Sequence, residues 1–276
     1  MATAAALRPR TGAGLLFLLS VAVLALVALA AVFGPLLVPY DPTEFITDDP
    51  FAAPDRATWL GSDYMGRDML SRMLYGTRLT MTMALGATLL AHLIGVSLGM
   101  VAALAGGVAD QLLSRLVDVL LSLPKIVVGL GLVAALGPSI PVIMGVAAVV
   151  YAAGVFRIAR ALGMDLVSQD FVRVARARGE GLAWVLGAEM LPHMLRPLAA
   201  DFAIRTSFAI LFLSSLSFLG LGVQPPYADW GGLVRENLPG LSAGSFAPFY
   251  PALAIALVSI ALNLCVDALG AGRARR

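Results

Sequence analysis

The chain has 276 residues, of which 59% are hydrophobic and only 13% are charged, and its mean hydropathy is +0.89. A soluble domain usually carries about 25% charged residues, so this composition leaves too little polar surface for a water-soluble monomer and excludes that class. The formal net charge of +2 is too small to identify a partner by its sign.

Stretches without charged residues predict about six membrane-spanning helices. A span needs about 20 apolar residues, because the hydrocarbon core is about 30 Å thick and a helix rises 1.5 Å per residue. In the second predicted span, the spacing of Gly95 and Gly99 allows close contact with another helix. The spans lie near Leu15–Val38, Leu79–Leu104, Leu116–Leu136, Pro141–Ile158, Leu198–Leu219 and Pro251–Leu269.

These spans divide the chain into segments on the two sides of the membrane. They are a cytoplasmic N-terminus (1–14), an N-terminal anchor helix (15–38), an extracytoplasmic loop (39–78), a core domain (79–269) that contains a cytoplasmic loop (161–197), and a cytoplasmic C-terminus (270–276).

The first span could also be a cleaved signal peptide. Arg8 and Arg10 precede its apolar core, and Ala28-Leu-Ala30 is similar to a cleavage site. A cleaved signal has an apolar core of about 7–15 residues. Because this one continues to Val38, we expect a retained anchor.

Arginine positions predict the orientation, because cytoplasmic segments carry an excess of basic residues. With the N-terminus inside, the cytoplasmic segments hold Arg8, Arg10, Arg115, Arg157, Arg160, Arg173, Arg176, Arg178, Arg196, Arg273, Arg275 and Arg276. The opposite segments hold only Arg56, Arg67, Arg72, Arg78 and Arg235. We therefore expect a multi-pass protein of the bacterial inner membrane with both termini in the cytoplasm.

The sequence lacks the residue sets that common catalytic and metal sites require. Lys125 is the only lysine and follows Pro124, so the chain holds no Gly-Lys-Ser/Thr phosphate-binding loop and cannot hydrolyse ATP by that route. His92 and His193 lie far apart in the sequence, and Cys265 is the only cysteine, so we expect no metal, cofactor or intrachain disulfide. We therefore do not expect an enzyme.

Three aspartates leave an alternative function open. Asp118, Asp201 and Asp267 lie near membrane depth, where an ionisable group is a functional candidate by default. A proton-coupled secondary carrier would use such groups. Each of them also lies near a predicted membrane face, and we therefore favour the interpretation that each belongs to a solvated helix end.

The loop Ala161–Pro197 predicts two short helices, Phe171–Arg178 and Leu182–Met190, separated at Gly179. Glycine can adopt the positive φ that such a break requires. Exposed apolar residues beside a basic cluster predict a docking surface for a partner. The basic residues are Arg173, Arg176 and Arg178, and the apolar ones are Val174, Trp184, Val185 and Leu186.

This loop resembles the EAA loop of ABC importer permeases. The resemblance rests on Arg173-Val-Ala-Arg-Ala-Arg-Gly179, followed by Leu191-Pro192. The chain departs from the family pattern where Arg173 replaces an acidic residue and Glu189 replaces an aliphatic one. The resemblance implies that the ATPase-coupling residues are Arg173, Ala175, Arg176, Gly179, Leu191 and Pro192.

Two further blocks resemble the dipeptide/oligopeptide permease family, C-type subunit. One runs from Trp59 to Arg78 and the other from Ser217 to Pro226, followed by Asp229-Trp-Gly231. Arg115-Leu-Val-Asp118 and Leu123-Pro124 fit the same family, so the resemblance covers residues 15–269.

The family resemblance implies an all-α integral membrane protein of the type I ABC importer fold, with an anchor helix and a five-helix core. The implied partners are a homologous second permease, two ATP-binding-cassette ATPase subunits, an extracytoplasmic solute-binding protein and membrane lipid, with no nucleic acid. The implied mechanism is alternating access. The implied cargo is a di- or oligopeptide, with nickel, glutathione or another small solute as alternatives.

Lys125 departs from the small or apolar residue that the resembling family has after Leu-Pro. A lysine inside a span costs about 2.5–3.5 kcal/mol, so it needs a partner or a route to water. Asp118, seven residues earlier, would share a helix face with it at a rise of about 10.5 Å. Asp118 and Lys125 are therefore candidate pathway residues, although a lysine nearer the cytoplasmic end could instead extend to the headgroups.

The predicted orientation can be tested with single-cysteine variants in a Cys265→Ser background. An impermeant thiol reagent should label Asp55→Cys on intact cells and should reach Arg178→Cys only after the membrane is opened. Labelling at position 178 with protection at position 55 would reverse the assignment.

Overall fold

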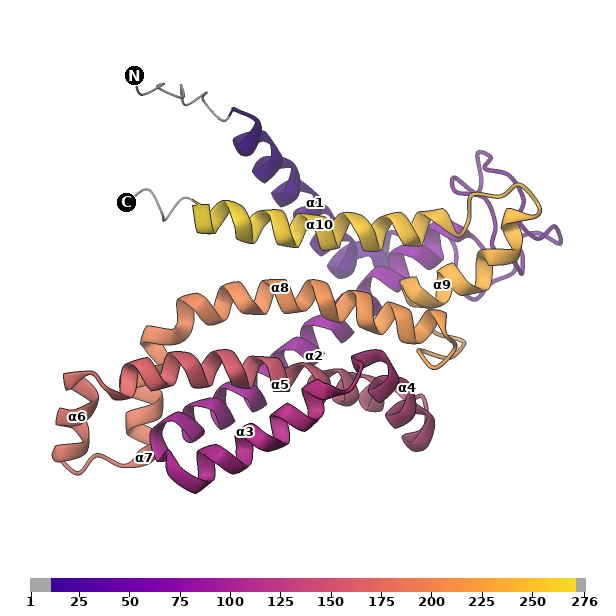
Figure 1. Cartoon of the computed structure of the whole chain (residues 1–276). Coiled ribbons are helices and arrows are strands. Elements are labelled where there is room, and N and C mark those ends of the chain that lie inside the picture. Colours follow the sequence, from indigo (N-terminus) through magenta and orange to yellow (C-terminus); the bar gives the residue numbers. More distant parts are fainter. Residues whose placement is uncertain (1–10, 272–276) are drawn as a thin grey trace, which may run out of the picture.

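The computed structural model describes residues 11–271, and these form helices joined by turns and loops (Figure 1). The predicted terminal segments fall largely on residues 1–10 and 272–276, outside the described residues. The long helices are α1 (Thr11–Leu37), α2 (Met69–Ala105), α5 (Ile140–Val167), α8 (Leu191–Phe218) and α10 (Phe249–Ala271). The shorter ones are α3 (Gly107–Ser122), α4 (Lys125–Leu136), α6 (Asp170–Ala177), α7 (Leu182–Trp184), the π-helix η1 (Val185–Met190), α9 (Trp230–Asn237) and the 3₁₀-helix η2 (Leu238–Leu241).

The helix count confirms the prediction of about six spans. Five helices of the described chain are long and apolar enough to cross a membrane, and the bent pair α3–α4 is a sixth if it counts as one broken span. In Figure 1 the first loop and α9 lie at one end of the bundle, and α6 lies at the other. We call these the first-loop end and the α6 end.

Helices α2 and α5 form the centre of the bundle through very close backbone contact. A Cβ at Gly95 would lie 2.6 Å from the Cβ of Val155, and one at Gly99 would lie 2.8 Å from the Cβ of Ala159. Only glycine fits at both positions, because real Cβ atoms essentially never approach so closely. The close helix contact predicted from the spacing of these two glycines is confirmed.

Two long helices begin earlier than the charge-free stretches predicted. Helix α2 begins at Met69 because Asp68 caps it, with its Oδ2 accepting from the backbone N–H of Ser71 at 2.7 Å. Helix α8 begins at Leu191 and contains Pro197. Charged residues marked the limits of the predicted spans, but a helix continues past the membrane face wherever its backbone groups have partners.

The prediction of one continuous span over Leu116–Leu136 is wrong. Helix α3 ends at Ser122, α4 begins at Lys125, and their axes are bent by 93°. Proline lacks an N–H and disfavours helical backbone in the residue before it. Leu123, which precedes Pro124, accordingly has an extended conformation with φ −93° and ψ 142°.

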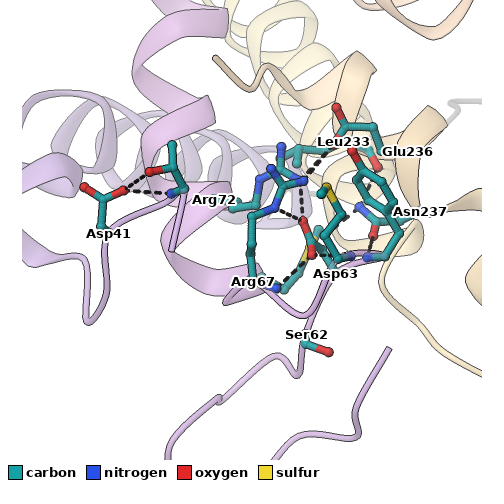
Figure 2. A network of polar contacts seen from close by, with 12 residues as sticks. Asp41, Ser62, Asp63, Arg67, Arg72, Leu233, Glu236 and Asn237 are labelled. Atoms are coloured by element: carbon teal, nitrogen blue, oxygen red, sulfur yellow. Dashed lines mark hydrogen bonds and ion pairs between the residues drawn. The ribbon is translucent and has the colours of Figure 1, made fainter. Parts of the chain in front are cut away.

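A buried ion network joins the first loop to α9, as Figure 2 shows. The Asp63 carboxylate is fully buried, and its Oδ2 accepts from Arg67 Nε at 2.8 Å and Arg72 Nη1 at 2.5 Å. Arg72 also donates to Glu236 at 2.8 Å, and Asn237 accepts from the backbone N–H of Tyr64. We call Asp63, Arg67, Arg72, Glu236 and Asn237 the clasp.

The turn that carries Asp63 depends on two glycines of the Trp59–Arg78 block. Gly61 and Gly66 have φ of 74° and 76°, which L side chains rarely adopt. A Cβ at Gly66 would also lie only 1.9 Å from the carbonyl oxygen of Thr47. The block therefore contains both the glycines that allow the turn and the charged residues of the clasp that hold the turn in place.

Removing the central carboxylate of the clasp should destabilise the protein. Asp63→Asn leaves two buried guanidinium groups sharing Glu236, and breaking a buried ion pair costs about 3–5 kcal/mol. We expect a lower melting temperature for the purified protein in detergent and faster proteolysis of the first loop. The control is Asp48→Asn, an exposed aspartate of the same loop. Equal melting temperatures for the two variants would show that the clasp does not stabilise the fold.

Candidate functional site

Helix α6 lies at the α6 end of the bundle and contributes several exposed side chains to its surface. It covers Asp170–Ala177, within one residue of the predicted bounds. Val172 and Ala175 are fully buried against the bundle, and Phe171 stacks on His193 of α8 with ring centroids 4.7 Å apart. The small side chain of Ala175 is thus part of the packing that holds α6 in place.

Gly179 ends the turn after α6 in the left-handed conformation, with φ of 80°, and this confirms the predicted positive φ. Its N–H donates to the carbonyl of Arg176, and the N–H of Glu180 donates to that of Ala175. Because no atom lies within 4 Å of a Cβ built at Gly179, the demand for glycine comes from backbone conformation and not from crowding.

The helix predicted over Leu182–Met190 is confirmed, because α7 and η1 together cover these residues, but its predicted separation from the next span is wrong. Helix α7 passes directly into η1 and then into α8, so residues Leu182–Phe218 form one continuous apolar helix. Leu191 and Pro192 lie in the first turn of α8. Val185 is buried and Leu186 is partly buried, so the predicted exposure of these two residues is also wrong.

The outward side of this region is basic and apolar. Val174, Leu182 and Trp184 are each more than half exposed. Arg173, Arg176 and Arg178 are exposed too, as predicted. We call these six residues the α6 surface. Such a combination is typical of a docking site for another protein.

Glu189, at the position where the resembling family has an aliphatic residue, lies 3.7 Å from Arg178. Glu180 lies at the same distance from that guanidinium. The two acids therefore hold Arg178 across the Gly179 turn, which gives the departure at residue 189 a structural reason.

A polar group lies inside the bundle between α2 and α8. Asp201 Oδ2 accepts from Arg205 Nε at 2.6 Å and lies 3.2 Å from His92 Nε2. The side chain of Asp201 is only 11% exposed, so its interpretation as a solvated helix end is wrong. The pairing with Arg205 and His92 offsets the cost of a carboxylate at this depth.

Lys125 of α4 and Arg205 of α8 lie against the same part of α5. Lys125 Nζ is 5.1 Å from the centroid of the Tyr151 ring, and the Tyr151 hydroxyl donates to the carbonyl of Phe208 at 2.8 Å. One turn further along α5, a Cβ at Gly154 would lie 2.6 Å from Arg205 Nη1. We call Lys125 and Arg205 the α5 cation pair.

The surroundings of the α5 cation pair do not neutralise its two positive charges. Among the described residues no carboxylate lies within 4.0 Å of Lys125, and the only acid on Arg205 is Asp201, which His92 shares. An uncompensated cation in a membrane-spanning bundle needs access to water or to an anion, so the surroundings of this pair favour an anion.

The structure does not bring Asp118 and Lys125 together. Asp118 lies on α3 and accepts from Arg157 of α5 at 2.7 Å, whereas Lys125 begins α4 beyond the bend. The predicted shared helix face is wrong, because Pro124 interrupts the helix. Sequence reasoning missed Arg205 as a site residue, although an arginine in an apolar stretch was a signal that could have identified it.

The sequence matches the family model described as "Binding-protein-dependent transport system inner membrane component" over residues 95–276. It is 33% identical to the di/tripeptide transport system permease protein DppC of Pseudomonas aeruginosa, over 93% of this chain and 84% of that protein. It is 32% identical to the dipeptide transport system permease protein DppC of Haemophilus influenzae, over 93% and 87%. It is 33% identical to the glutathione transport system permease protein GsiD of Pectobacterium atrosepticum, over 93% and 83%.

These matches cover both the bundle and the α6 surface. Membership of the family implies an inner-membrane location and, as partners, an ATPase and a solute-binding protein. The chain belongs to the family of inner membrane components of binding-protein-dependent transport systems, and it is therefore a permease subunit of an ABC importer and not an enzyme.

Proposed function

We propose that this permease forms part of the translocation pathway for di- or oligopeptides, and the α5 cation pair carries the proposal. A peptide ends in a carboxylate, which Lys125 and Arg205 can receive inside the membrane. The names of the relatives, which concern dipeptides, tripeptides and glutathione, support the same class of cargo. Nickel fits less well, because a cation would be repelled at this site.

The complete importer would contain a homologous second permease, two ATPase subunits and an extracytoplasmic binding protein. Both termini and the α6 surface would face the cytoplasm, with the first loop outside. The arginine distribution supports this orientation, and so does the separation of the first-loop end from the α6 end in Figure 1. The proton-coupled carrier is not favoured, because Asp118 and Asp201 are already paired with arginines.

We propose that the ATPase binds the α6 surface and transmits its movement from there to the translocation pathway. A partner that moves Trp184 moves the start of a helix that continues without a break to Phe218. Arg205 lies on the same helix, so a shift of α8 along or about its axis changes how Arg205 packs on Gly154. The Gly179 turn lets α6 and α7 move relative to each other. Alternating access would follow from this movement.

The role of the turn can be tested with Gly179→Val. A β-branched residue at φ of 80° costs about 1–3 kcal/mol of local strain and should misplace the α6 surface. We expect membrane insertion to be retained, while uptake and the stimulation of ATPase activity by loaded binding protein are lost. The matched control is Gly181→Val, because Gly181 has an ordinary φ of −69° and open space around it. Transport by Gly179→Val at the rate of the control would exclude the turn as a coupling element.

The pathway role of Lys125 can be tested in proteoliposomes with saturating loaded binding protein. Lys125→Met removes the charge from an exposed side chain at the start of α4 and should preserve folding. We expect uptake of a zwitterionic dipeptide to fall about tenfold while ATPase activity is retained, as expected for one charged contact. The charge-preserving Lys125→Arg should lose much less. If Lys125→Met and the wild type take up the dipeptide equally, Lys125 does not contact the cargo.

A further inference from the structure

A second polar cavity lies at the first-loop end, apart from the α5 cation pair. Its volume is about 350 Å³, near the lower end of the roughly 300–1,000 Å³ typical of small-molecule sites. It is lined by Tyr64 of the first loop, by Gln224 and Pro225 after α8, and by Arg235 and Glu236 of α9. Through Glu236 the cavity adjoins the clasp shown in Figure 2.

Gly220 leaves the space that the guanidinium of Arg235 occupies beside this cavity. A Cβ at Gly220 would lie 2.8 Å from Arg235 Nη1 and 2.9 Å from its Cζ, so any larger residue would displace the guanidinium. Gly220 itself has φ of 91°, which also favours glycine. Within residues 11–271 no carboxylate lies within 4.0 Å of Arg235, so its exposed guanidinium has no ion-pair partner in the described part of the chain.

The surrounding charges leave the cavity positive. Asp63 and Glu236 are matched by Arg67 and Arg72 in the clasp, with Glu236 2.8 Å from Arg72 and 3.7 Å from Arg67. The clasp is therefore neutral, and Arg235 adds one uncompensated positive charge beside it.

Asp229 does not neutralise Arg235 either. It is buried at the start of α9, where its oxygens accept from the backbone N–H groups of Gly231 and Gly232. Burial raises the pKa of this carboxyl to about 6, which further reduces its negative charge in mildly acidic solution. The cavity thus favours an anion over a cation.

The hydrogen-bond donors and acceptors that line the cavity match the C-terminus of a peptide. A guanidinium presents two parallel N–H groups that match both oxygens of a carboxylate. Gln224 donates its Nε2 hydrogens to the carbonyls of Gly220 and Gly222, at 3.3 and 2.8 Å, which leaves its Oε1 as an acceptor. An acceptor beside Arg235 can take the last amide N–H of a peptide whose carboxylate lies on the guanidinium.

We propose that this cavity is a first binding site for the C-terminal carboxylate of the cargo, held by Arg235 before the cargo reaches the α5 cation pair. This inference rests on the proposed peptide cargo. The end of α8 supplies Ser217 to the same cavity, so the helix that carries Arg205 also borders the cavity.

The test compares uptake of trialanine with uptake of its C-terminal amide in proteoliposomes that hold the complete importer. Each peptide is supplied at a concentration that saturates the binding protein, so that the preference of that protein does not enter. We expect the wild type to transport the acid about tenfold faster than the amide, as expected for one charged hydrogen-bonded contact. Arg235→Gln should remove this preference by slowing the acid alone, and Arg235→Lys should keep part of it.

Arg56→Gln serves as the matched control, because Arg56 is an exposed arginine of the first loop without an ion-pair partner in the described chain, and it should keep the wild-type preference. An unchanged preference in Arg235→Gln would overturn the site while leaving the peptide cargo intact. Equal loss of acid and amide uptake, with weaker stimulation of ATPase activity, would overturn it in favour of a docking contact with the binding protein. If the wild type imports neither peptide, the proposed cargo itself is wrong, and this site falls with it.

Discussion

The interior of a membrane cannot solvate charge, and the structure of this protein depends on how each ionised group meets that constraint. Asp201 is held by Arg205 and His92, and Asp118 is held by Arg157. Lys125 is the exception, since its nearest described partner is the face of an aromatic ring. A cation without a carboxylate partner is costly in lipid and needs access to water or an anion, which is why we propose that Lys125 borders the translocation pathway.

Helix α8 connects the three sites. It continues from α7 at the α6 surface, carries Asp201 and Arg205 in its interior, and reaches the cavity of Arg235 through Ser217. The π-helical segment η1 lies at the start of this path, and such segments occur frequently at functional sites. Under the proposed coupling, a displacement at the α6 surface would reach the membrane interior and the opposite end through this one helix.

The first-loop end is built more rigidly than its loop content suggests. The clasp joins α2 and α9 through fully or largely buried charges, and the Gly61 and Gly66 turns fix the segment between them. A buried ion network is strongly destabilised when one member is removed, so it specifies one arrangement of the two helices. This rigidity fixes the part of the cavity wall that Tyr64 and Glu236 supply.

The sequence by itself determined the membrane class, the number of spans, the close contact at Gly95 and Gly99, and the positive φ of Gly179. All of these follow from local composition and from the conformational freedom of single residues. Only the tertiary structure decided which charges meet, because the partners lie far apart in the chain: Asp118 meets Arg157, and Glu236 meets Arg72. The continuity of α7 with α8 also depended on packing, because a local pattern shows where a helix can end but does not decide whether it ends there.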